Sequence, residues 1–276
     1  MPVIAIRERI HSYTMRMLAA AWFGAGLFFA SLTYCAYFHL IVLGQPDVVP
    51  ADQVPAAIAA NVALFSAFAL HHSVFARSGI KARLARILPP AFERSAYVWI
   101  ASLLFLGVCL LWQPLPGVAW EATGALRYLL YGVQLAGLVF TLQSASRLDI
   151  WDLSGVRQVR TARQAAEAAG TTDGPRGAHS AAAANTSSAA LPTAAPAPLE
   201  VRGPYRWLRH PIYLGWVLLV FGVPAMTAGR LLFAAVSTAY LVVAIPIEER
   251  SLIAEFGQSY RDYQRRVRWR LVPGVW

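Results

Sequence analysis

The chain has 276 residues, of which 57% are hydrophobic and only 14% are charged. This balance excludes an ordinary soluble domain and favours a membrane protein. The net charge of +10 would suggest nucleic acid as the partner of a soluble protein, but here the arginines lie between long apolar runs. We therefore expect a lipid bilayer as partner and no nucleic acid. The two cysteines, Cys35 and Cys109, lie inside apolar runs and form neither a disulfide framework nor a metal-ligand spacing, so no metal site is predicted.

The first apolar run, Leu18 to Leu43, follows an N-terminal segment that contains three arginines. It is too long for the apolar core of a cleavable signal peptide, so we expect a retained first span. Three more runs are near the roughly 20 residues that a helix needs to cross the hydrocarbon core. These runs are Pro55–Phe75, Ser95–Trp112 and Ala125–Ser146. The sequence thus predicts four spans in its first half.

Two shorter apolar runs near the C-terminus, Pro211–Met226 and Leu231–Ile247, are divided by a turn-prone segment that ends in Arg230. Each is at the lower length limit for crossing a membrane alone. We expect a helical hairpin that is tilted, kinked at Pro224 and Pro246, or packed inside the bundle. The predicted fold class is therefore all-α, a polytopic membrane bundle with about six transmembrane segments.

The distribution of basic residues predicts the orientation of this bundle. Arg230 is the only basic residue in the loops at 44–54, 113–124 and 227–230, and Arg127 lies just inside the fourth run. The other 22 of the 24 Lys and Arg residues fall on the opposite side. Because cytoplasmic loops hold the excess of Lys and Arg, we expect both termini and the functional site on the cytoplasmic side.

Composition divides the chain into three parts. Residues 1–163 hold the N-terminal helices, and residues 201–276 hold the hairpin and a polar tail. Between them, residues 164–200 are rich in Ala, Ser, Thr and Pro and contain no aromatic side chain. Such a segment cannot bury enough apolar surface to offset its ordering entropy, so it is predicted to be a disordered cytoplasmic insert.

The stretch RGPYRWLRHPIYLGW, residues 202–216, predicts a helix that begins at Pro211 with His210 at its cap. A helix N-terminus attracts anions, and Arg206 and Arg209 would add forked donors for a carboxylate or phosphate. The alternative is that the arginines anchor the helix at the membrane edge and that the neighbouring tyrosines are interface residues.

Glu248 and Glu249 lie where the second helix of the hairpin is expected to leave the membrane. Because a hairpin returns to the side on which it began, we expect both carboxylates close to Arg206, Arg209 and His210. A ligand with a carboxylate, positive centres and a flat ring, such as S-adenosylmethionine, would match this pattern.

The order of GPYRWLRHPIYLG, a short hairpin, EE and FGQSYRDYQRRV resembles the C-terminal region of the isoprenylcysteine carboxyl methyltransferase and phospholipid methyltransferase superfamily. The resemblance covers Arg202 to about Pro273 and implies a membrane enzyme that uses S-adenosylmethionine without a Rossmann domain. It also implies a cofactor pocket lined by Arg206, Arg209, His210, Pro211, Tyr213, Gly215, Glu248 and Glu249.

Two upstream segments narrow the resemblance. LHHSVFARSGIKARLARILPPAFERSAYVWIASLLF at 70–105 and RLDIWDLSGVRQV at 147–159 are similar to the methanethiol S-methyltransferase branch of the superfamily. This similarity implies a bacterial inner-membrane enzyme that methylates a small thiol, methanethiol, to dimethyl sulfide.

Methyl transfer to a thiol requires a thiolate in line with the sulfonium methyl group. We expect His72 or Asp149 to take the thiol proton and Arg157 to stabilise charge, since ionisable groups inside a membrane are functional candidates. A packing role is the alternative for His72 and its neighbour His71. Other acceptors also fit the pattern, namely a prenylated cysteine carboxylate or a phospholipid amine. A transport protein with a structural ion-pair network and a membrane reductase with a nicotinamide cofactor are further alternatives.

Overall fold

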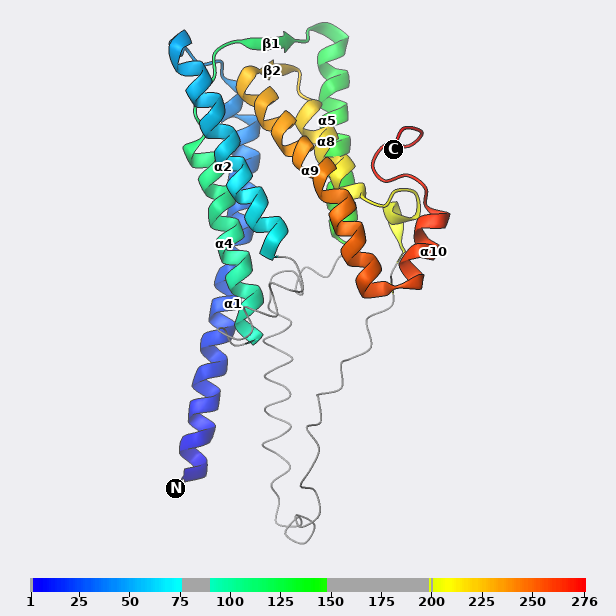
Figure 1. Cartoon of the computed structure of the whole chain (residues 1–276). Helices are drawn as coiled ribbons and strands as arrows, with labels where there is room; N and C mark the ends of the chain where they lie inside the picture. Colours follow the sequence, from blue (N-terminus) through cyan, green and yellow to red (C-terminus); the bar gives the residue numbers. More distant parts are fainter. Residues whose placement is uncertain (1, 76–89, 148–198, 200) are drawn as a thin grey trace.

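The structure is a computed structural model that describes residues 2–75, 90–147, 199 and 201–276. Within these residues, the chain is mainly helical (Figure 1). The longer helices are α1 (Pro2–Leu40), α2 (Val54–Phe75), α4 (Pro90–Leu111), α5 (Gly124–Ala145), α8 (Pro211–Phe221), α9 (Ala228–Phe256) and α10 (Gln258–Arg266). Three short 3-10 turns accompany them, η1 (Val42–Gly44), η2 (Ala51–Gln53) and η3 (Gly203–Arg206). The predicted helical class is confirmed.

The helices form two groups that meet at α9. In one group α4 packs against both α1 and α2, and in the other α8 packs between α5 and α9. Helix α9 also contacts α2 and so joins the groups. Aromatic side chains fill the junction, where the fully buried Phe233 ring lies 5.9 Å from the rings of Phe38 and Phe65 and 5.5 Å from that of Trp112.

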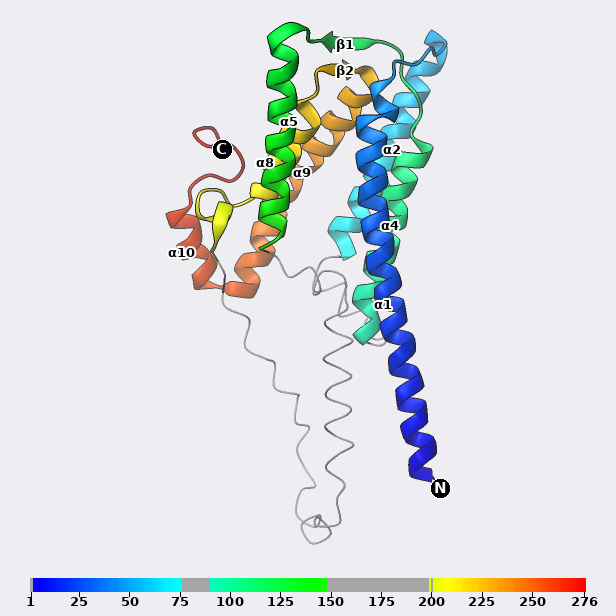
Figure 2. The same ribbon diagram turned by 180° about the vertical axis from the view of Figure 1, so that it is seen from behind.

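A two-stranded antiparallel sheet closes one end of the bundle (Figures 1 and 2). Strand β1 (Val118–Glu121) pairs with β2 (Ala225–Thr227), with Trp120 opposite Met226 and a bulge between Val118 and Trp120. The all-α prediction did not include these strands, because segments of four and three residues are too short to show a periodic pattern.

Among the described residues, four helical segments are long and apolar enough to cross a membrane: Leu18–Gly44, Ala51–Phe75, Gly124–Ala145 and Ala228–Phe256. The two apolar runs of the predicted hairpin form helices of unequal length. Helix α8 has only 11 residues, whereas α9 has 29 and continues through Pro246 and both glutamates to Phe256. At about 1.5 Å per residue, α8 is too short to cross the hydrocarbon core and α9 is long enough.

Close packing of α5 against α8 fixes where the C-terminal motif lies. A Cβ atom on Gly215 would lie 2.2 Å from Thr141 Oγ1 and 2.9 Å from the Gly137 carbonyl oxygen. A residue without a side chain is therefore required at this contact. The contact places the start of α8 beside the end of α5.

Candidate functional site

The candidate site is built around the start of α8. The predicted boundary is confirmed, since α8 begins at Pro211 with His210 at the cap position. The residues just before α8 pair with the C-terminal tail: Arg209 N donates to the Trp269 carbonyl (3.0 Å) and His210 N donates to the Arg270 carbonyl (2.9 Å). These bonds hold the side chains of Arg209 and His210 in a fixed position.

Glu249 is the centre of an ion-pair cluster behind this segment. Its carboxylate lies 3.1 Å from Arg209 Nε and 3.2 Å from Arg270 Nε, and its Oε1 lies 3.5 Å from His210 Nε2. The Arg209 contact is close enough for an ion pair, but its N–H is not aligned for a hydrogen bond. Glu249 is only 3% exposed. Its charge therefore organises the site from within the protein.

Glu248 takes a different position. Its side chain is 44% exposed, and its Oε2 accepts a hydrogen bond from the Tyr213 hydroxyl at 2.7 Å. The same oxygen lies 3.6 Å from His210 Nδ1. The His210 and Tyr213 rings stack with 5.4 Å between their centroids. The two adjacent glutamates thus face different surroundings, one buried and one open.

Helix α10 supplies an aromatic wall. Tyr260 and Tyr263 are buried, and the Tyr263 hydroxyl donates to the carbonyl oxygens of Tyr205 (2.8 Å) and Leu208 (3.2 Å). Burial, and secondarily the charge of Glu248, raise the pKa of Tyr205 to about 12. Burial likewise raises the pKa values of Tyr260 and Tyr263. All three phenols are therefore neutral at physiological pH.

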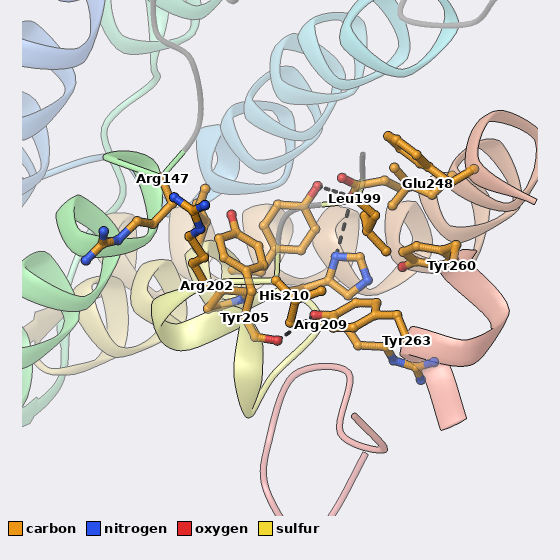
Figure 3. Close-up of a pocket in the computed structure, with 15 residues that line it drawn as sticks. Arg147, Leu199, Arg202, Tyr205, Arg209, His210, Glu248, Tyr260 and Tyr263 are labelled. Carbon is orange, nitrogen blue, oxygen red and sulfur yellow. Dashed lines mark hydrogen bonds and ion pairs between the residues drawn. The ribbon is translucent and has the colours of Figure 1, made fainter. Parts of the chain in front are cut away.

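These elements enclose a cavity of about 340 Å³. Figure 3 shows Arg147 and Arg202 on one side of it and Glu248 and Tyr260 on the other. Its lining is Arg147, Leu199, Val201, Arg202, Tyr205, Arg209, His210, Pro211, Ile212, Tyr213, Glu248, Leu252, Phe256, Tyr260 and Tyr263. The cavity combines both signs of charge with several rings.

The structure brings together most of the residues predicted to bind the cofactor. Arg209, His210, Pro211, Tyr213 and Glu248 line the cavity, and Glu249 lies directly behind it.

Besides Glu249, two predicted cofactor residues do not line the cavity. Arg206 is exposed at the end of η3, and Gly215 packs against α5 instead. The sequence pattern did not separate these roles because all the residues lie within one short motif.

The structure does not bring the predicted catalytic residues to the cavity: one lies away from it and two lie outside the described residues. His72 lies near the end of α2, where its Nδ1 is 2.9 Å from the Tyr97 hydroxyl, and it does not line the cavity. Asp149 and Arg157 lie outside the described residues, as does most of the predicted insert. Their assignment as catalytic groups stays a prediction.

Several cavity residues were missed in the sequence. One of them is Arg147, at the end of α5. It packs closely on Gly203, whose φ is +56°, because a Cβ on this glycine would lie 3.3 Å from Arg147 Nε. Arg202 and Tyr205 lie within the stretch 202–216 but were not assigned to the pocket, and their position beside the predicted anion site was the available signal. Tyr260 and Tyr263 lie in the FGQSYRDYQRRV segment of the resemblance, but only the folding of α10 against α9 brings them to the cavity.

Comparison with known proteins gives the class. Residues 185–254 match the model of the Isoprenylcysteine carboxyl methyltransferase (ICMT) family. Over 72 residues, a quarter of the chain, it is also 38% identical to a protein-S-isoprenylcysteine O-methyltransferase of Tribolium castaneum, of which it covers 26%. With the membrane helices of the fold, these matches define the protein as a membrane methyltransferase.

Longer matches identify the family. The chain is 37% identical over 244 residues to methanethiol S-methyltransferase 2 of Bradyrhizobium diazoefficiens, which covers 87% of this chain and 83% of the relative. It is 34% identical over 229 residues to the methanethiol S-methyltransferase of Mycobacterium tuberculosis, with 83% of both chains covered. The chain therefore belongs to the methanethiol S-methyltransferase family. No solved structure matches it significantly.

Proposed function

We propose that the protein binds S-adenosylmethionine in the cavity and transfers its methyl group to methanethiol, forming dimethyl sulfide. The observation that carries this proposal is the arrangement of Glu248 and of Arg147 and Arg202 around one aromatic cavity. The names of the relatives that match most of the chain support the acceptor.

The lining fits the chemical groups of this cofactor. The Glu248 carboxylate suits an ammonium or sulfonium group, and the two arginines suit a carboxylate. The rings of Tyr205, Tyr260 and Tyr263 suit a flat heterocycle. The volume of about 340 Å³ is within the roughly 300–1,000 Å³ typical of small-molecule sites.

Glu249 acts in this proposal as a positioning residue. It is buried, forms ion pairs with Arg209 and Arg270, and contacts the ring of His210. Because these contacts connect α9, the segment before α8 and the C-terminal tail, they fix the cavity wall before the cofactor arrives. Such preorganisation lowers the entropic cost of binding.

When bound, S-adenosylmethionine supplies an electrophilic methyl group. The protein then has to orient a thiol and accept its proton. His72 or Asp149 is proposed as the proton acceptor and Arg157 as the group that stabilises charge. The contact with Tyr97 holds the His72 ring near the cytoplasmic end of α2.

The same proposal includes the topology. The arginine distribution supports about six membrane segments, with both termini and the cavity on the cytoplasmic side of a bacterial inner membrane. Helix α8 is too short to cross the hydrocarbon core by itself, and together with its flanking residues it forms the fifth segment, packed between α5 and α9.

Other acceptors are the alternative within this fold. A prenylated cysteine carboxylate would agree with the match of residues 185–254, and a phospholipid amine is the other alternative acceptor. The longer matches, which include the N-terminal helices, favour methanethiol.

Gas analysis above a culture tests the function. Cells that express the protein and receive methanethiol should release dimethyl sulfide, and cells with Glu248→Gln should release much less at equal protein level. Release no greater than from cells without the protein would reject methanethiol as acceptor. Assays of purified protein with a prenylated cysteine and with phosphatidylethanolamine would then test the alternatives.

A further inference from the structure

A second cavity lies at the opposite end of the bundle from the methyl-transfer site. It measures about 120 Å³ and lies where α5, α9, β1 and the segment before β2 meet. Its lining is Leu40, Glu121, Ala122, Arg127, Tyr131, Gln134, Val223, Pro224, Ala225 and Arg230. Since Arg230 and Glu248 are 18 residues apart in one helix, the two cavities are separated by about 27 Å along α9.

The two arginines of this cavity are the two basic residues that depart from the charge asymmetry of the chain. One comes from α5 and the other from α9, yet both line the same small cavity. An arginine at the less basic end of a membrane protein opposes the usual distribution. Their convergence indicates a shared role for Arg127 and Arg230.

Arg230 lines the cavity from α9. It is 7% exposed, and its guanidinium donates to the carbonyl oxygens of His39 (3.0 Å), Leu40 (2.6 Å) and Ala225 (2.6 Å). These partners are neutral. In the described part of the chain, no carboxylate forms an ion pair with it. A buried cation without an anionic partner favours a bound anion.

The cavity wall supplies further polar groups. Arg127, Tyr131 and Gln134 follow one another at helical spacing on one face of α5, and the exposed Arg127 forms no ion pair with a described carboxylate. Glu121 from β1 adds one negative group to the same lining. Two cationic groups and one anionic group suit a ligand with a phosphate and an ammonium group.

The surroundings are those of a lipid headgroup site. Below the cavity, α5 exposes Leu135, Leu138 and Leu142, and its Tyr128 and Tyr131 are exposed beside the cavity. Exposed leucines suit acyl chains, and tyrosines are typical of the level of the headgroups. We propose that this cavity binds an aminophospholipid headgroup, with its phosphate at Arg127 and Arg230 and its ammonium at Glu121. This inference is independent of the methyl-transfer reaction.

Native mass spectrometry of the detergent-purified full chain, titrated with single lipids, tests the proposal. Phosphatidylethanolamine should bind more tightly than phosphatidylcholine, whose nitrogen carries no N–H, and than phosphatidylglycerol, which lacks nitrogen. Arg127→Gln should weaken phosphatidylethanolamine binding about tenfold or more, since a charge-assisted hydrogen bond is lost. Glu121→Gln should remove the preference over phosphatidylcholine.

Arg265→Gln is the control, because Arg265 is exposed on α10 and pairs only with exposed Asp262 among the described residues. It should leave the affinity unchanged. Equal affinity for all three lipids, or an unchanged affinity in Arg127→Gln, would overturn the proposal. Soluble phosphoethanolamine is titrated in parallel, and binding as tight as that of the lipid would overturn the assignment to a membrane ligand.

Discussion

The Glu249 carboxylate lies 3.1 Å from Arg209 Nε, and the two side chains are only 4% and 10% exposed. This ion pair joins α9 to the segment before α8, and Arg270 adds the C-terminal tail to the same carboxylate. Its neighbour Glu248 is open to the cavity. The two glutamates should therefore respond differently to the same substitution.

Glu249→Gln should lower the stability of the protein, because it leaves Arg209 and Arg270 without their buried anionic partner. Removing one partner of a buried ion pair typically costs about 3–5 kcal/mol. Thermal unfolding in detergent measures the effect. Glu248→Gln is the matched control, and its more exposed carboxylate should make the loss of stability much smaller. Equal losses in both variants would contradict the separate roles.

Gly215→Ala should destabilise the contact between α5 and α8. The new Cβ would lie 2.2 Å from Thr141 Oγ1 and 2.9 Å from backbone atoms, so one of the helices must shift. Overpacking of this kind costs about 1–3 kcal/mol. The control is Gly132→Ala in α5, where a Cβ would meet no atom within 4 Å. If both variants unfold at the same temperature, the close contact is not required.

Tyr205 should contribute to a loss of stability at alkaline pH. Its pKa in the folded protein is raised to about 12, whereas an unfolded tyrosine loses its proton near pH 10. The contribution of the Tyr205 phenol to the free energy of unfolding is fully present below pH 10 and is lost as the pH rises to 12. Unfolding of Tyr205→Phe, followed against pH, should show a smaller decline over this interval. If the stabilities of Tyr205→Phe and the wild type decline equally over this interval, the alkaline sensitivity belongs to other groups.

Reporter fusions test the topology. Fusions after Gln45, Gly117 and Ala228 should be located outside the cytoplasm, and fusions after Arg83, Arg160 and the C-terminus inside it. The fusion after Ala228 is the most informative, because Arg230 lies beside it and α8 is too short to cross the membrane alone. A C-terminus outside the cytoplasm would reject the six-segment topology.

The sequence predicted those parts of the fold that depend on local patterns. Pro211 disfavours helix at His210 and suits a first helical turn, so the start of α8 was correctly placed. The apolar run was bounded at Ile247, with the two glutamates where the helix was expected to leave the membrane, and the length of the helix beyond that point was not predicted. The helix continues to Phe256, since Glu249 finds buried cationic partners there.

The cavity itself depended on contacts between distant segments. The hairpin argument brought Glu248 and Glu249 to His210, which is where the structure has them. Arg147 reaches the cavity only because α5 packs closely on α8, and Tyr260 only because α10 folds back on α9. No periodicity or spacing in one sequence encodes these two contacts.

The central claim is that the cavity between α8, α9 and α10 binds S-adenosylmethionine through Glu248. Titration calorimetry of the purified wild type, Glu248→Gln and Arg206→Gln tests it most directly, each protein first being checked for normal folding. We expect Glu248→Gln to weaken binding about tenfold or more and Arg206→Gln, whose side chain is exposed outside the cavity, to bind like the wild type. Equal affinities in all three proteins, or no binding to the wild type, would contradict the claim.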